Sequence, residues 1–125
     1  MLLNLGHTFA HALENELNYK IRHGEAVSVG LLMAMKLSYN LGYTKKNDFN
    51  LLESHLKKSK LPIKLKDLSN KKKWLSNNIL KKMQTDKKSY KGSIRFILCK
   101  GIGTAFIKQD IDKTKVKKTI EEFII

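Results

Sequence analysis

The chain has 125 residues, a length typical of one domain, and its hydrophobic fraction of 42% allows a buried core. Its single cysteine, Cys99, excludes an internal disulfide and any zinc site built on several cysteines. The net charge of +14 suggests a polyanionic partner. However, all of the 25 basic residues except Arg22 and Arg95 are lysine, and aromatic residues are not interleaved with them. We therefore expect a lysine-rich surface and no specific nucleic-acid binding.

The first half of the chain predicts three helices. Apolar residues at three- and four-residue spacing indicate one from about His7 to Tyr19 and a more apolar one from about Gly24 to Leu41, which we expect at the centre of the core. Gly42 stands where a helix C-cap is expected, and Thr44 is a candidate cap for the third helix. The inward residues predicted for these helices are Phe9, Ala10, Leu13, Leu17, Val27, Leu31, Met35, Leu37, Phe49, Leu52 and Leu56.

The second half adds two helices and a hairpin. Pro62 ends the third helix, and the following "LPIKLKDLSN" predicts a loop or short turn. The stretch "KKKWLSNNILKKMQTDKK" predicts a fourth helix, and "DIDKTKVKKTIEEFII" predicts the last one. Between them, "SIRFILC" and "TAFIKQ" are β-type runs joined by "KGIG", typical of a hairpin. The inward residues predicted here are Trp74, Ile79, Leu80, Met83, Val116, Ile120 and Phe123.

The expected fold class is therefore mainly α: a single multi-helical domain over residues 1–125 with one small β-hairpin near the C-terminus. The start, "MLLNLGHTF", lacks the charged and long apolar regions of a signal peptide. The longest apolar stretch, "AVSVGLLMAM", is about half of what a membrane span needs. We expect a cytoplasmic protein with no membrane partner.

Three of the four histidines fall within the first 23 residues. His7 and His11 are spaced to share one face of a helix, and His23 follows across the expected turn between two helices. Neutral imidazole is a common ligand of transition metals, so spacing alone favours His7 and His11 as a metal pair. The alternative is that both are polar members of an amphipathic face. His55 has no such neighbour and is interpreted as a surface or packing residue.

The blocks that carry these histidines resemble a known family. "LLNLGHTFAHALE" followed by "HGEAVSVGLLMA" is similar to 3-dehydroquinate synthase, a sugar-phosphate cyclase, and "DKK", "RFIL" and "IG" follow in the family's order. The resemblance implies a lyase of the shikimate pathway of aromatic amino acid biosynthesis. It implies conversion of 3-deoxy-D-arabino-heptulosonate 7-phosphate to 3-dehydroquinate and phosphate, with NAD and one divalent metal, zinc or cobalt. A homodimer is common in the family.

Residue roles follow from the same resemblance. His7 and His23 match the family's histidine metal ligands, so the resemblance and the spacing disagree about His11. His11 matches a proton-transfer residue that contacts the phosphate end of the substrate. Asn4 matches a substrate-binding amide, and Lys87 matches a phosphate-contacting lysine, with the adjacent Lys88 as second choice. Glu25 is expected to stabilise the helix start or to contact a metal-binding residue, without binding the metal itself.

The resemblance covers a C-terminal domain only. The family's third metal ligand is a glutamate earlier in its chain, and its NAD site lies mainly in an N-terminal domain. We find no glycine-rich dinucleotide fingerprint in this sequence, because "KGIG" follows a strand but opens no helix. We therefore expect half of a site, without the N-terminal NAD-binding domain, and a chain inactive alone.

Four alternatives remain open. Other sugar-phosphate cyclases share the metal site, and iron-dependent alcohol or glycerol dehydrogenases share the two-domain plan, although "NLGHTF" and "DKK…RFIL" favour the synthase. A different class is a non-catalytic module that binds a metal or an anion. Charge alone motivates nucleic-acid binding, which predicts tight and steeply salt-dependent association with DNA.

Overall fold

A computed structural model describes residues 5–84 and 94–124 of the chain. The described elements, in order, are α1 (His7–Glu16), α2 (His23–Asn40), α3 (Lys46–Lys58), α4 (Leu65–Leu68), α5 (Ser76–Gln84), β1 (Phe96–Lys100), β2 (Thr104–Lys108) and α6 (Lys113–Glu121). This confirms the predicted fold class. No helix in the described segments is long and apolar enough to cross a membrane.

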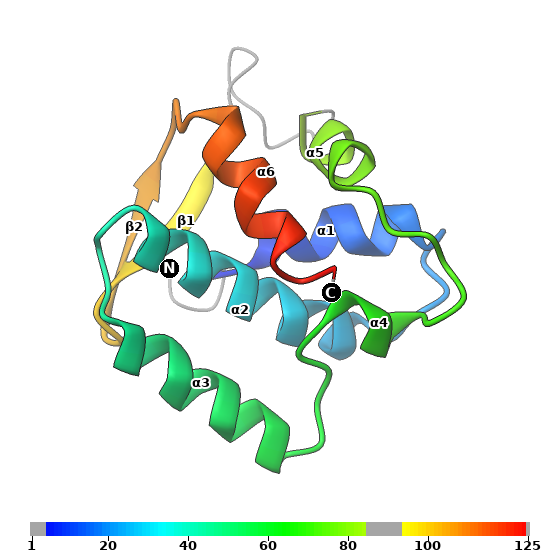
Figure 1. Ribbon diagram of the computed structural model, residues 1–125, viewed down its shortest axis with the longest axis horizontal. Coiled ribbons are helices and arrows are strands. Elements are labelled where there is room, and N and C mark those ends of the chain that lie inside the picture. Colours follow the sequence, from blue (N-terminus) through cyan, green and yellow to red (C-terminus); the bar gives the residue numbers. More distant parts are fainter. Residues whose placement is uncertain (1–4, 85–93, 125) are drawn as a thin grey trace.

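The apolar helix α2 crosses the middle of the molecule, with α3 on one side and α6 on the other (Figure 1). It also packs against α1, α4 and β1. β1 and β2 form an antiparallel hairpin in which Phe96 is opposite Lys108 and Lys100 is opposite Thr104. The largest fully buried side chains come from most of these elements: Phe9, Leu13, Leu32, Met33, Leu37, Leu65, Ile79, Met83, Leu98 and Ile120.

Two buried hydrogen bonds fix the hairpin on α2. The backbone N–H of Cys99 donates to Ser38 Oγ over 3.0 Å, and the Ser38 hydroxyl donates to the carbonyl of Ala34 over 2.8 Å. The Cys99 N–H and the Ser38 hydroxyl therefore both have partners, which avoids the free-energy penalty of leaving these buried groups unsatisfied. β2 is also held to the segment that follows α2, where the rings of Tyr43 and Phe106 pack edge to face at 4.8 Å.

The helix boundaries differ from the predictions where local backbone geometry overrides periodicity. The first helix ends at Glu16, before the predicted Tyr19, because Asn18 and Tyr19 adopt left-handed conformations. The α5 helix begins only at Ser76, and the predicted loop after Pro62 contains the one-turn helix α4. Gly42 has φ +87° directly after α2, which confirms the predicted C-cap.

Two other predictions about α2 and α3 were wrong in detail. Val27 and Leu31 are half-buried, because α2 is covered on several sides and buries other positions more deeply. Thr44 does not cap α3: its hydroxyl is buried without a hydrogen-bond partner among the described residues. The Asp48 carboxylate instead accepts from the backbone N–H of Lys45 at the helix start, over 3.1 Å.

Two glycines allow α1 and α2 to approach at backbone distance. A Cβ atom on Gly30 would lie 2.5 Å from the carbonyl oxygen of Gly6 and 3.0 Å from the backbone nitrogen of Ala10. A Cβ atom on Gly6 would lie 2.5 Å from the nitrogen of Leu31, and Gly6 also has φ +83°. Both positions therefore require glycine.

We predict that Gly30→Ala lowers the free energy of unfolding by about 1–3 kcal/mol, because the two helix backbones must separate. Gly24, in the same helix, is the matched control, since a Cβ atom there meets nothing within 4 Å. Gly24→Ala should be neutral or slightly stabilising. Urea denaturation of both variants measures the difference, and equal stability of the two would contradict the proposed close crossing.

Burial raises the pKa of the Cys99 thiol, and the negative charge of Asp48 raises it further. The thiol thus stays neutral to a higher pH in the folded protein than in the unfolded chain, where it ionises near its ordinary pKa of 9.0. We predict that the wild type loses stability relative to Cys99→Ala above pH 9, by at most about 1.4 kcal/mol per pH unit. Urea denaturation of both proteins at pH 8 and pH 10 tests this, and a pH-independent difference would refute it.

Candidate functional site

Three histidines from the first two helices lie together. His7 and His11 are one turn apart on α1, and their ring centroids are stacked at 5.8 Å. The ring of His23, the first residue of α2, is edge-on to that of His7 at 5.9 Å. The structure therefore brings these three predicted site residues together around His7. The ring distances are compatible with both of the metal-ligand pairs considered from the sequence, His7 with His11 and His7 with His23.

A tight reversal of the chain returns His23 to α1. Asn18 and Tyr19 adopt φ values of +54° and +60°, which turn the backbone sharply at the end of α1. The Tyr19 N–H donates to the Glu14 carbonyl over 2.7 Å and fixes this turn. Arg22 is extended, so α2 starts at His23 and runs back along α1. The position of His23 thus depends on two unfavourable backbone conformations that packing must stabilise.

The sequence analysis missed Glu14, which lies behind the histidines. Its Oε2 is 3.1 Å from His23 Nδ1, and its side chain is 11% exposed against 58% for His23. His7, His11 and Glu14 recur at positions i, i+4 and i+7, so they share one face of α1. An acidic residue at this spacing from two histidines was the signal in the sequence.

A second carboxylate on α1 has a different environment. Glu16 Oε1 is 3.2 Å from Lys72 Nζ, and the Glu16 side chain is nearly buried. The Lys72 ammonium also lies 5.8 Å from the centroid of the Trp74 ring. Glu16 thus joins α1 to the segment before α5 through an ion pair, whereas Glu14 faces an imidazole.

The start of the hairpin is bound to the N-terminal end of α1, beside His7. The Thr8 hydroxyl donates to the carbonyl of Arg95 over 2.9 Å, and the rings of Phe9 and Phe96 pack at 5.6 Å. Thr8 lies next to His7 in the chain. This hydrogen bond therefore holds the entrance of β1 beside the histidine cluster.

Some predicted residues cannot be placed. Asn4, Lys87 and Lys88 lie outside the described residues. Glu25 is at the start of α2, where its carboxylate accepts a long hydrogen bond of 3.4 Å from the backbone N–H of Arg22. This confirms the helix-start role expected for Glu25.

The histidines offer part of a metal site. No group of three or more His, Cys, Asp and Glu side chains within residues 5–84 and 94–124 is arranged to hold an ion. His7 and His23 nevertheless present two imidazoles, the nitrogen donors that zinc and cobalt accept. A catalytic zinc has three protein ligands, so a third would have to come from outside the described residues. The donor set therefore fits a metal as one part of its coordination sphere.

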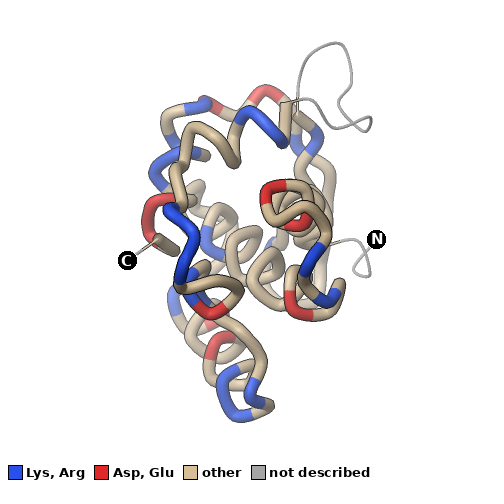
Figure 2. The backbone as a smooth tube through the Cα atoms, turned by 90° about the vertical axis from the view of Figure 1, so that its right-hand side faces the viewer, with Lys and Arg blue, Asp and Glu red and all other residues tan. Residues whose placement is uncertain are grey.

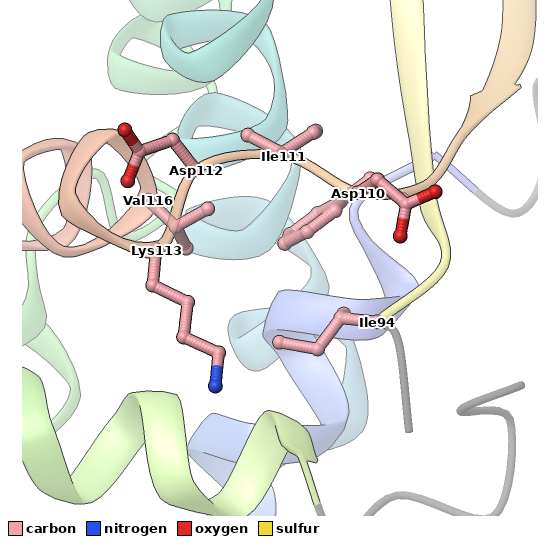
Figure 3. A pocket seen from close by; sticks show the side chains of 7 residues that line it. Ile94, Asp110, Ile111, Asp112, Lys113 and Val116 are labelled. Atoms are coloured by element: carbon pink, nitrogen blue, oxygen red, sulfur yellow. The ribbon is translucent and has the colours of Figure 1, made fainter. Parts of the chain in front are cut away.

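A hollow of about 230 Å³ lies elsewhere, between the start of β1 and the start of α6 (Figure 3). The side chain of Lys113 extends into the same space as that of Ile94, while Asp110 points away from them. The lining residues are Ile94, Phe96, Asp110, Ile111, Asp112, Lys113 and Val116. None of the three histidines lines this hollow. The histidine cluster is the candidate functional site because the imidazole side chains, which are possible metal ligands, lie there and not at this hollow.

The basic residues are spread over several elements of the described chain. Figure 2 shows Lys and Arg on several separate elements with Asp and Glu among them. A continuous basic stripe is typical of nucleic-acid binding. The distribution therefore supports the interpretation of a lysine-rich surface.

A family model described as 3-dehydroquinate synthase C-terminal matches residues 1–89, the segment that contains the histidine cluster. The chain belongs to this 3-dehydroquinate synthase family. It is 42% identical over 123 residues to the 3-dehydroquinate synthase of Vesicomyosocius okutanii subsp. Calyptogena okutanii, covering 98% of this chain and 33% of that protein. It is 42% identical over 125 residues to that of Campylobacter curvus, covering 98% and 34%. The chain thus spans about a third of these synthases.

Solved structures of sugar-phosphate cyclases share the fold. A 2-deoxy-scyllo-inosose synthase in complex with carbaglucose-6-phosphate, NAD+ and Co2+ matches with a TM-score of 0.77 and 25% identity, over 96% of this chain and 33% of that one. The 2-epi-5-epi-valiolone synthase of Streptomyces hygroscopicus subsp. jinggangensis, with NAD+ and Zn2+ bound, matches with a TM-score of 0.78 and 17% identity. It covers 96% of this chain and 32% of its own. At this identity the second match supports the fold alone.

We predict that Thr8→Val costs about 0.5–1.5 kcal/mol of stability, because the Arg95 carbonyl loses its donor while the side-chain shape is kept. Thr8→Ser retains the hydroxyl and should stay closer to the wild type. Urea denaturation of the three proteins measures the effect. A Thr8→Val variant as stable as the wild type would show that this bond contributes nothing.

Proposed function

We propose that this chain is the metal- and substrate-binding domain of a 3-dehydroquinate synthase. The reaction is the conversion of 3-deoxy-D-arabino-heptulosonate 7-phosphate to 3-dehydroquinate and phosphate, a lyase step of the shikimate pathway in the cytoplasm. The observation that carries the proposal is the cluster of His7, His11 and His23, since these residues belong to the block on which the family match rests.

His7 and His23 are the proposed metal ligands. Their rings are close enough to face a common ion, and each histidine is the first residue of its helix. When bound, zinc or cobalt supplies Lewis-acid polarisation of the hydroxyl to be oxidised and of the carbonyl it becomes. The Co2+ in the 2-deoxy-scyllo-inosose synthase structure supports a divalent metal at this place.

His11 is proposed to handle protons and to contact the phosphate end of the substrate. Its ring stacks on that of His7, so a substrate held near His7 lies beside it. Imidazole exchanges protons near neutral pH, which suits both acceptance and return of a proton. Asn4 and Lys87, with Lys88 as second choice, are proposed on the resemblance to bind the substrate hydroxyls and phosphate.

Catalysis is proposed to need a partner domain. Oxidation of a hydroxyl requires NAD held against the substrate, and the third metal ligand is expected to be a glutamate. We propose that both come from an N-terminal domain, and that residues 1–125 alone bind metal weakly and lack activity. The chain's coverage of about a third of its relatives supports this division.

A second candidate function is that of another sugar-phosphate cyclase. The match to 2-deoxy-scyllo-inosose synthase at 25% identity favours it. We rank it lower because the curated synthases are about 42% identical over nearly the whole chain. The substrate accepted by the chain together with an N-terminal domain of a related synthase and NAD distinguishes the two functions. Phosphate release from the heptulosonate supports the 3-dehydroquinate synthase function. Turnover of glucose 6-phosphate without turnover of the heptulosonate supports the second candidate function.

We predict that the purified chain binds Zn2+ and that His7→Ala and His23→Ala each abolish binding, because two imidazoles are the minimum set. His55→Ala is the matched control, since His55 lies exposed on α3 outside the cluster. Isothermal titration calorimetry measures the affinities. Equal zinc uptake by wild type, His7→Ala and His23→Ala, or no uptake by any of them, would contradict the metal half-site.

A further inference from the structure

We propose that Glu14 is a positioning residue for His23. Its carboxylate holds the imidazole as the tautomer protonated on Nδ1 and thereby leaves Nε2 unprotonated in a ring whose centroid is 5.9 Å from that of His7. The part of this proposal that uses Nε2 as a metal ligand rests on the proposed function. The orientation of His23 by Glu14 does not.

Hydrogen-bond chemistry fixes the tautomer. An ionised carboxylate has only acceptors, so in the 3.1 Å contact the proton must lie on His23 Nδ1, which donates to Glu14 Oε2. A neutral imidazole carries one ring proton, and Nε2 is then left with a free lone pair. A solvent-exposed neutral histidine without such a partner favours the other tautomer, with the proton on Nε2.

The environment of the two residues makes this control effective. His23 is 58% exposed, so water alone would leave its ring free to rotate. Glu14 is 11% exposed and belongs to the packed face of α1, between the buried residues Ala12 and Leu13 and the helix end. The nearly buried carboxylate of Glu14 therefore orients the imidazole of His23, which is exposed to solvent.

Burial of a carboxylate in an apolar face is costly unless a partner offsets it. Glu16 shows the ordinary solution on the same helix, because Lys72 supplies a permanent charge. Glu14 is instead paired with the imidazole of His23. A carboxylate behind a histidine ligand is a recurrent arrangement at metal sites, where it sets tautomer and ring orientation.

The first experiment needs no metal. Nitrogen-15 NMR of the labelled chain at pH 8, where imidazole is neutral, reports which ring nitrogen of His23 carries the proton. We expect Nδ1 in the wild type, a mixture in Glu14→Gln, and a shift toward Nε2 protonation in Glu14→Met, which has no acceptor of this kind. Glu16→Gln is the matched control and should resemble the wild type.

The proposal is overturned if His23 is protonated on Nε2 in the wild type, or if the Glu14 variants leave its tautomer unchanged. Circular dichroism identifies any variant that has lost its fold. Because Glu14→Gln keeps the size of the side chain and Glu14→Met keeps an apolar wall, a folded protein is expected from at least one of them.

The second experiment is a Zn2+ titration of the same proteins. We expect Glu14→Gln to bind about 10- to 100-fold more weakly than the wild type, and Glu16→Gln to bind as the wild type does. Equal affinity of wild type and Glu14→Gln would overturn the proposed role toward the metal. If the wild type takes up no zinc, the metal half-site of the proposed function fails, and the NMR result decides the role of Glu14 by itself.

Discussion

The contact between the backbones of Gly6 and Gly30 is the constraint on which the histidine site depends. No side chain separates α1 from α2 at this point, so the two helices are as close as their main chains allow. Gly6 directly precedes His7, and α2 runs from Gly30 back to His23. The close crossing therefore sets the distance between the helix that carries two histidines and the helix that begins with the third.

Much of this fold follows from the pattern of apolar residues. The central position of α2, the hairpin and the inward residues of α5 and α6 all follow from periodicity, which reports burial directly. The end of α1 and the cap of α3 do not, because they depend on individual backbone conformations. Asn18 and Tyr19 adopt left-handed geometry without being glycine, and no local sequence rule demands this.

The candidate site was predictable in its residues more than in its geometry. Spacing placed His7 and His11 on one face, but only the folded turn shows that His23 reaches the same point. Glu14 escaped notice because a glutamate within a helix is usually a solvated residue, and its burial becomes visible only once α2 covers that face. A contact between side chains of two helices, such as Glu14 and His23, cannot be read from the apolar periodicity of either helix.

The hydrogen bond from Thr8 to Arg95 spans 87 positions, whereas every histidine of the cluster lies within the first 23 residues. Closing a short loop costs less entropy than closing a long one. The imidazoles are thus arranged by a local helical pair. The hairpin, which comes from the far end of the sequence, contacts α1 beside His7 through the Thr8 hydroxyl and the Phe9–Phe96 ring pair, and it contacts α2 through the hydrogen bond from Cys99 to Ser38. The close approach of the two helices therefore constrains Gly6 and Gly30 directly, whereas the hairpin acts on the histidines through the residues beside His7.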